Sequence, residues 1–202
     1  MKKALLIGCG GKRGEKIIQG CHQANFDVVN IGSSRSSLPQ VENYVIDWNT
    51  FEIAEMHKLF RKLHYRFDFI FFNQNASSLA KENFTKLINT LDLWGLTKDW
   101  GKSYWLSCQM PFVLIKTLES SKINKNTIIG WMLSSYIDRH QDGVEDNADY
   151  SGYKFTNYLI MKNFNKRYQC FGIDPEFQTK DKITGLIAEI CSGQRKCNGE
   201  VF

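Results

Sequence analysis

A tyrosine and a lysine four residues apart, Tyr150 and Lys154, are the residues of this sequence best suited to proton chemistry. They lie at the head of a segment that reads as a helix, and residues at i and i+4 share one helical face. An ammonium beside a phenol favours the phenolate, which lowers a tyrosine pKa from its ordinary value of about 10. Such a phenol can exchange a proton with a substrate oxygen. The same spacing also fits a lysine lying over a packed ring, so the rest of the chain decides its meaning.

A glycine-rich segment follows the first strand that the sequence predicts, Lys3 to Ile7. The segment and the start of the helix behind it consist of Gly8, Cys9, Gly10, Gly11, Lys12, Arg13 and Gly14. When strand, glycine turn and helix come in this order, backbone N–H groups and the helix N-terminus can approach a phosphate closely. We therefore predict a dinucleotide-binding turn. The alternative is a tight turn that happens to be rich in glycine.

The end of the second predicted strand, Phe26 to Ile31, indicates which dinucleotide binds. Folds selective for NAD carry an acidic residue near this point, where it holds the ribose 2′-hydroxyl. This chain instead has Gly32, Ser33, Ser34 and Arg35. No carboxylate is there to repel a 2′-phosphate, and Arg35, Lys12 and Arg13 supply positive charge, so the sequence favours NADP, with NAD as the second choice. The alternative is that these cations are solvated surface residues.

Polar residues also follow the later predicted strands, at the edge where open α/β sheets bind their ligands. Asp47 and Trp48 follow a third strand, Asn43 to Ile46, and Asn75, Ala76 and Ser77 come shortly after the apolar strand Phe67 to Phe72. Ser134 and Ser135 follow Thr127 to Leu133, and Pro175 and Thr179 follow Tyr168 to Ile173. We expect these residues to gather around one ligand.

Apolar residues at helical spacing predict helices between these strands. We expect them after the glycine turn, from about 51 to 63, around 84–91, from about 103 to 119, from the Tyr150 stretch to about 167, and around 183–190. Pro111 predicts a bend in the fourth of these. The alternation predicts an α/β fold, a doubly wound parallel sheet of about seven strands with helices on both faces and a closing strand at Val201-Phe202.

Length and composition are those of an ordinary globular protein. At 202 residues we expect one NAD(P)-binding domain, and the net charge of +5 fits an anionic ligand but is too diffuse to require nucleic acid. No segment approaches the roughly 20 apolar residues of a membrane span. The six cysteines form no C-x-x-C pair and no metal-like spacing with histidine, which favours free thiols in a reducing cytosol. We therefore expect a cytoplasmic protein with no metal site and no membrane or nucleic-acid partner.

These motifs, in this order, resemble the short-chain dehydrogenase/reductase family across nearly the whole chain. The resemblance rests on the glycine turn, the aspartate after the third strand, Asn-Ala-Ser after the fourth, the serine after the fifth, Tyr-x-x-x-Lys and Pro-x-x-x-Thr. Each motif is weak alone, but six in register are specific. The resemblance implies a Rossmann-type domain that passes hydride between a nicotinamide cofactor and a carbonyl or alcohol.

The resemblance also implies roles for individual residues. Tyr150 would be the general acid for reduction and the base for oxidation. Lys154 would lower the tyrosine pKa and hydrogen-bond the nicotinamide ribose. Ser135, with Ser134 as the alternative, would hold the substrate oxygen, and Tyr153 is a weaker candidate than Tyr150. Asp47 and Trp48 would edge the adenine, while Asn75, Ala76 and Ser77 would line the ribose and nicotinamide side.

The sequence departs from the family pattern at several points. Lys12 replaces the middle glycine of the turn, although Gly8, Gly11 and Gly14 fit the spacing of longer relatives. By register Ser107 stands where the family has a helical asparagine that completes its catalytic group. After Thr179 the chain passes directly into the last predicted helix, without the substrate-covering segment of most relatives. We therefore expect an open site, or one completed by a neighbouring subunit in a homodimer or homotetramer.

Two functions follow from these observations. The first is an NADPH-dependent oxidoreductase that converts a small carbonyl to an alcohol or the reverse. The alternative is a non-catalytic dinucleotide-binding sensor or scaffold, favoured by the missing asparagine and the short substrate segment. The Ser, Tyr and Lys set favours the enzyme. RNA binding through the basic residues is less well supported, because no aromatic platform accompanies them.

Overall fold

A parallel β-sheet organises the molecule. The computed structural model describes residues 1–47, 53–73, 104–133, 148–175 and 179–202. Its strands are β1 (Lys2–Ile7), β2 (Phe26–Gly32), β3 (Val41–Val45), β4 (Phe69–Phe72), β5 (Ile128–Met132), β6 (Gln169–Ile173) and β7 (Glu200–Val201). They form a seven-stranded sheet in the order β3-β2-β1-β4-β5-β6-β7, and every neighbouring pair is parallel. The predicted doubly wound α/β fold is confirmed.

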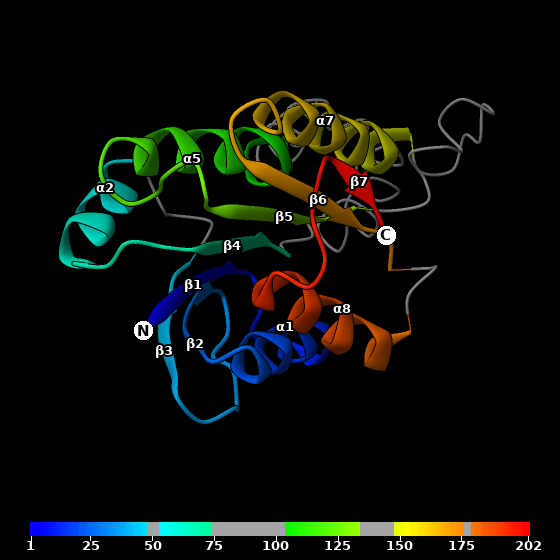
Figure 1. The fold of residues 1–202 in the computed structure, drawn as a ribbon. Coiled ribbons are helices and arrows are strands. Elements are labelled where there is room, and N and C mark those ends of the chain that lie inside the picture. The colour runs from blue at the N-terminus through cyan, green and yellow to red at the C-terminus, as the bar shows by residue number, and fades with distance from the viewer. Residues whose placement is uncertain (48–52, 74–103, 134–147, 176–178) are drawn as a thin grey trace, which may run out of the picture.

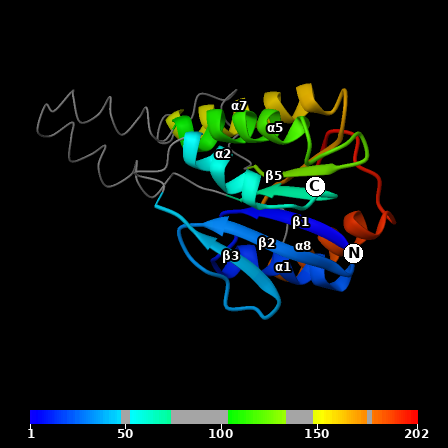
Figure 2. The same ribbon diagram turned by 90° about the vertical axis from the view of Figure 1, so that its left-hand side faces the viewer.

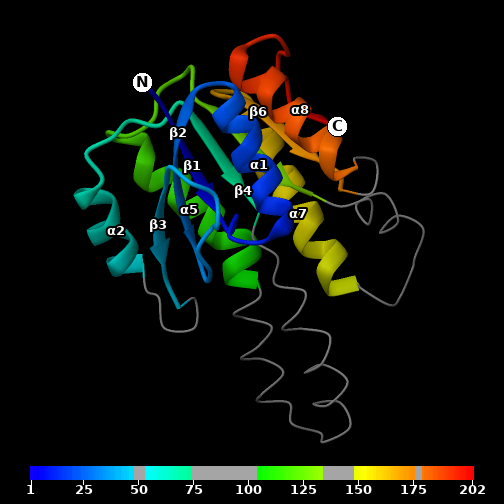
Figure 3. The same cartoon turned by 90° about the horizontal axis from the view of Figure 1, so that it is seen from below.

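Helices cover both faces of this sheet (Figure 1). On one face lie α2 (Ile53–Lys62), the π-helical turn η1 (Trp105–Gln109), α5 (Met110–Glu119) and α7 (Ala148–Phe164). On the other face lie α1 (Lys12–Gln23) and α8 (Lys180–Ser192), which pack side by side (Figures 2 and 3). Because parallel strands are joined by crossover helices, both sheet faces become buried.

Two apolar cores result, one on each face of the sheet. Alternation along β1 divides its side chains, with Leu5 and Ile7 in the core beneath α2, α5 and α7, and Ala4 and Leu6 in the core beneath α1 and α8. Phe72 and Trp131 stack at 5.5 Å in the first core. Both faces of the central strands are therefore apolar, as expected for a sheet that is buried on both sides.

The strand order fixes where a ligand can bind. The chain leaves β1 on one side toward β2 and β3, then crosses to β4 on the other side of β1. Ligands bind in such folds at the carboxyl ends of the strands where the order reverses. Gly8 begins the turn there, and its N–H donates to the Ile31 carbonyl at 2.8 Å. Asn73 N–H donates to the Ile7 carbonyl at 2.8 Å, so three strand ends are joined at this point.

The predicted elements agree with the structure except at some boundaries. The third strand begins at Val41, two residues earlier than expected, because Val41 pairs with Val28 of β2. The helix predicted around 84–91 lies outside the described residues. Pro111 stands in the first turn of α5, directly after η1. Proline has no N–H to give the Ser107 carbonyl four residues back, which explains why the regular helix starts only at Met110.

No helix in the described part of the chain is long and apolar enough to cross a membrane.

Helices α1 and α8 approach each other closely at Gly20. A Cβ placed on Gly20 would lie 2.6 Å from the Thr184 carbonyl oxygen and 2.7 Å from the Ile187 Cβ. The Thr184 hydroxyl also donates to the Lys16 carbonyl at 3.1 Å. By contrast, a Cβ on Gly185, in the interior of α8, meets nothing within 4 Å.

These two helical glycines give opposite predictions. Gly20→Ala should lower the free energy of unfolding by roughly 1–3 kcal/mol, because the added methyl forces α1 and α8 apart. Gly185→Ala should raise it by about 0.5–1 kcal/mol, because alanine is the better helix former in open space. Urea unfolding followed by circular dichroism measures both values. Equal effects of the two substitutions would contradict this packing.

Candidate active site

The buried lysine of α7 is the centre of the candidate site. Lys154 is only 4% exposed, although it carries an ammonium group. Its Nζ donates to the Met132 carbonyl at 2.8 Å, at the carboxyl end of β5. The side chain therefore runs from the helix to the edge of the sheet where the glycine turn lies. A buried ammonium is costly unless its hydrogen bonds are made, so this placement is an unusual feature of the fold.

Burial changes the acidity of this lysine. The pKa of the Lys154 ammonium is lowered from 10.5 to about 8. Loss of hydration is the larger cause, and the positive charge of Arg13 is the smaller one. Arg13 lies in the first turn of α1, on the opposite face of the sheet. Arg13 and Lys154 therefore place two positive charges close enough to interact, which suits an anionic ligand.

Tyr150 lies one helical turn before Lys154 in α7. Both residues therefore belong to one helix, as the sequence predicts, and residues four apart share a helical face. The position of the Tyr150 side chain lies outside what the structure describes, so its contact with Lys154 stays a prediction. Tyr153, the weaker candidate, is buried, and its ring lies 6.2 Å from that of Tyr104.

The glycines of the turn meet different demands. Gly8 has φ +77°, a left-handed conformation that favours glycine. A Cβ on Gly10 would lie 2.3 Å from the Ser34 carbonyl oxygen, and one on Gly14 would lie 2.3 Å from the Cys9 Cα. Gly11 precedes α1 as its N-cap, and a Cβ there meets nothing within 4 Å. The turn is thus tightly packed at Gly10 and Gly14 but open at Gly11, at the helix N-terminus, where an anion would approach.

The cations predicted to hold phosphate are accessible. Lys12 and Arg13 are exposed in the first turn of α1. Ser33, Ser34 and Arg35 are exposed in the loop after β2. Gly10 packs against Ser34, so this loop and the glycine turn lie next to each other. Asp47, after β3, is also exposed. The structure brings these predicted residues together at one edge of the sheet.

Other predicted site residues are placed less completely. Trp48, Asn75, Ala76, Ser77, Ser134 and Ser135 lie outside the described residues. Pro175 follows β6 and is half-buried, and Thr179 is the exposed N-cap residue of α8, with its carbonyl accepting the Ile183 N–H at 3.1 Å. The side chain of Ser107 is not described, although its backbone lies in η1. The roles of all these residues remain predictions.

Sequence reasoning missed two asparagines beneath the site. Asn30, in the middle of β2, is fully buried, and its Oδ1 accepts the Cys9 N–H of the glycine turn at 3.1 Å. Its Nδ2 donates to Asn43 Oδ1 on β3 at 3.0 Å. The signal was present in the sequence, because a single amide interrupts the apolar run from Val28 to Ile31. Asn73, directly after β4, holds the turn from the other side, because its Nδ2 donates to the Gly8 carbonyl at 2.9 Å.

The π-helical turn η1 packs against α7 through Cys108. The Cys108 Sγ lies 3.6 Å from the Tyr153 carbonyl oxygen, and the thiol is buried. Burial raises the pKa of Cys108 to about 11, against the smaller opposing effects of a hydrogen bond with Thr156 and the charge of Lys154. The thiol therefore stays protonated near neutrality and packs as a small apolar group.

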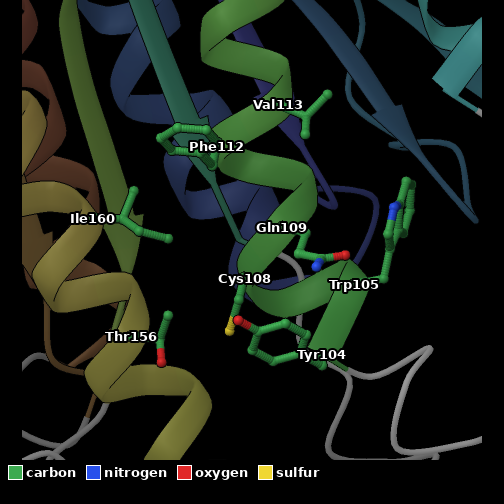
Figure 4. Close-up of a pocket in the computed structure, with 8 residues that line it drawn as sticks. All are labelled: Tyr104, Trp105, Cys108, Gln109, Phe112, Val113, Thr156 and Ile160. Carbon is green, nitrogen blue, oxygen red and sulfur yellow. The ribbon is translucent and has the colours of Figure 1, made fainter.

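A groove of about 510 Å³ runs between η1, α5 and α7 on the outer side of the helical layer (Figure 4). Its walls are Tyr104, Trp105, Cys108, Gln109, Phe112, Val113, Thr156 and Ile160. Phe112 and Leu159, on the facing helices, are 42% and 52% exposed. The resemblance to the short-chain dehydrogenase/reductase family implies assembly through the helices that contain Leu114 and Tyr158, and that stays a prediction.

In the part of the chain that the structure describes, no three histidine, cysteine, aspartate or glutamate residues are placed to hold a metal ion.

Comparison with solved structures identifies the fold. A short-chain dehydrogenase family protein from Francisella tularensis superposes with a TM-score of 0.70 at 14% identity, covering 100% of this chain and 96% of its own. A Brucella melitensis protein described as a short-chain dehydrogenase/reductase, glucose/ribitol dehydrogenase, gives 0.70 at 16% identity, covering 99% and 93%. The RhlG/NADP complex from Pseudomonas aeruginosa gives 0.68 at 13% identity, covering 100% and 93%.

The chain has the fold of the short-chain dehydrogenases/reductases. No protein-family model matches the sequence, and no curated protein matches it. The similarity therefore lies in the three-dimensional structure, over nearly the full length of both chains. In this structure Arg13 follows the glycine turn in α1, and Lys154 of α7 reaches the end of β5, so both lie at the carboxyl edge of the sheet.

The depressed pKa of Lys154 predicts a pH dependence of stability. The folded protein loses this proton near pH 8, whereas the unfolded chain keeps it to about 10.5. Between these values the unfolded state binds more protons, so the contribution of Lys154 to the free energy of unfolding rises with pH. The free energy of unfolding of the wild-type protein minus that of Lys154→Met should rise by on the order of 3 kcal/mol between these two pH values.

Urea unfolding at a series of pH values measures this difference. Lys166→Met removes an exposed lysine just beyond α7 and controls for the loss of one positive charge. A wild-type minus Lys154→Met difference that stays constant, or that falls as the pH rises, would show that the ammonium is not buried in this way.

Proposed function

We propose that this protein is an oxidoreductase of the short-chain dehydrogenase/reductase family that uses NADPH to reduce a small carbonyl compound, or catalyses the reverse oxidation. One observation carries the proposal: a buried ammonium, Lys154, with a pKa lowered to about 8, lies one helical turn after Tyr150 at the carboxyl end of the sheet. Perturbed ionisable groups at a ligand-binding edge are typical of active sites. The solved neighbours with this fold are dehydrogenases and reductases.

The residues around the turn fit a dinucleotide phosphate. Gly11 leaves open space at the N-terminus of α1, whose free N–H groups attract an anion. Arg35 and Lys12 supply positive charge, and Ser33 and Ser34 stand where NAD-selective folds carry an acidic residue. This arrangement suits the 2′-phosphate of NADP better than the unphosphorylated ribose of NAD. Two solved neighbours contain NADP, in agreement with this choice.

The chain's own residues divide the remaining work. When bound, a nicotinamide cofactor supplies or accepts the hydride. Tyr150 gives its phenolic proton to the carbonyl oxygen during reduction, and takes it back from the alcohol during oxidation. Lys154 favours the phenolate through its charge, and Ser135 donates a hydrogen bond to the substrate oxygen as negative charge develops there. Ser134 is the alternative for this last role.

A non-catalytic sensor or scaffold of the same fold is the second candidate. The observation that favours it is Ser107 at the position where the family has its helical asparagine. The burial of Lys154 one helical turn after Tyr150 favours the enzyme, because a perturbed ionisable group at a ligand-binding edge is typical of active sites.

Replacing Tyr150 separates the two candidates. Tyr150→Phe should lower NADPH oxidation by at least about 100-fold, because the phenylalanine ring has no proton to transfer. NADPH binding, followed by tryptophan fluorescence, should be nearly unchanged. The assay uses a panel of small aldehydes and ketones, since the sequence does not name the substrate. Tyr153→Phe, on the same helix, is the matched control and should keep its turnover.

An active Tyr150→Phe enzyme would contradict the role of Tyr150. If wild-type protein binds NADPH but oxidises it with no member of the panel, the sensor or scaffold is supported instead.

A further inference from the structure

We propose that Asn30 and Asn43 form a positioning pair that sets the preference for NADPH over NADH by holding Arg35 in place. This inference rests on the proposed cofactor and adds to it. Neither asparagine would touch the dinucleotide. Each acts through the loop after β2, which carries the exposed guanidinium that we assign to the 2′-phosphate.

The two asparagines face each other across neighbouring strands. Asn30 of β2 and Asn43 of β3 are direct partners in the parallel register. The Asn30 side chain is fully buried, and its Nδ2 donates to Asn43 Oδ1 at 3.0 Å. A buried amide at the centre of an apolar strand costs stability unless its hydrogen bonds are satisfied. Here all of its polar atoms are used, so the pair is a built part of this edge.

Each amide also holds a segment of the candidate cofactor site. Asn30 Oδ1 accepts the Cys9 N–H of the glycine turn at 3.1 Å, and Asn30 Nδ2 also lies 3.4 Å from the Ser34 carbonyl oxygen, to which it donates. Asn43 Oδ1 accepts the Ser36 N–H at 3.0 Å. One connected set of hydrogen bonds therefore links the turn to the loop after β2.

Arg35 stands between the two loop residues that the pair holds. Ser34 is fixed on one side by Asn30 and by its contact with Gly10, where not even a Cβ would fit. Ser36 is fixed on the other side by Asn43 and is only 8% exposed. The backbone of Arg35 is thus held at both ends, while its side chain is exposed and free to meet an anion.

Further contacts fasten the same loop. The Ser36 hydroxyl accepts the Leu38 N–H at 3.2 Å, and the Ser37 hydroxyl donates to Glu15 of α1 at 2.6 Å. A cation held by such a rigid backbone loses less entropy when it binds a phosphate than one on a loose loop. Fixing the backbone of Arg35 should therefore strengthen binding of the 2′-phosphate in particular.

The two asparagines differ in what they hold, so their replacement should have different effects. Asn43→Leu frees Ser36 and the loop but leaves the contact of Asn30 with Cys9. It should raise the Kd for NADPH roughly tenfold, because Arg35 then loses about one charged hydrogen bond to the 2′-phosphate. The Kd for NADH, which has no 2′-phosphate, should change little. Asn30→Leu also frees the glycine turn and should weaken both cofactors.

A double-mutant cycle gives the decisive measurement. Arg35→Ala, at an exposed position, should raise the Kd for NADPH by a similar factor, and Asn43→Leu should add nothing further in that background. Thr127→Val is the matched control, because Thr127 is buried and bonded to the Phe67 carbonyl and the Asn124 N–H at the far, amino end of β5. It should leave the ratio of the two Kd values unchanged.

The Kd values come from titration of each purified variant with NADPH and with NADH, and urea unfolding measures its stability. A Kd ratio unchanged by Asn43→Leu, additive effects of Asn43→Leu and Arg35→Ala, or an equal change in Thr127→Val would each overturn the role of the pair. In those cases wild-type selectivity for NADPH still stands. Wild-type protein that binds neither cofactor, or both equally, overturns the proposed cofactor and the inference with it.

Discussion

The burial of one ammonium group is the constraint on which the candidate site depends. Lys154 reaches from α7 to the end of β5, where the Met132 carbonyl accepts its hydrogen bond at 2.8 Å. Removal from water favours the neutral amine, so the group binds its proton less tightly than a surface lysine. Any anion or developing phenolate beside it restores the charged form. Burial thus makes the lysine responsive to what occupies the site.

The sheet topology brings the other parts of the site to this lysine. Because β1 lies between β2 and β4, the glycine turn after β1, the loop after β2 and the end of β4 meet at one edge. Asn30 ties the turn to the loop from within the sheet, and Asn73 ties the end of β4 to Gly8. Arg13 extends from this cluster close enough to influence Lys154 on the opposite face. The result is one connected, positively charged region built from segments far apart in sequence.

Much of this arrangement could be predicted from the sequence. Apolar runs such as Phe69–Phe72 are typical of buried parallel strands. The glycines after β1 are explained by the left-handed φ of Gly8 and by close backbone approach at Gly10 and Gly14. The pairing of Asn30 with Asn43 could not be predicted, because it depends on the register of β2 and β3. The depth of Lys154 depends likewise on how α7 packs over β5. Local pattern gives the elements and their order, whereas burial and cross-strand partners come from tertiary packing.

The central claim is that the Lys154 ammonium makes the phenol of Tyr150 more acidic, and a spectrophotometric titration tests it directly. The tyrosinate absorbance of wild-type protein minus that of Tyr150→Phe isolates the ionisation of this one residue. We predict a pKa clearly below the ordinary value of about 10 in the wild-type background, and a return toward that value when Lys154→Met is the background. A Tyr150 that titrates at about 10 or above in both backgrounds would contradict the account.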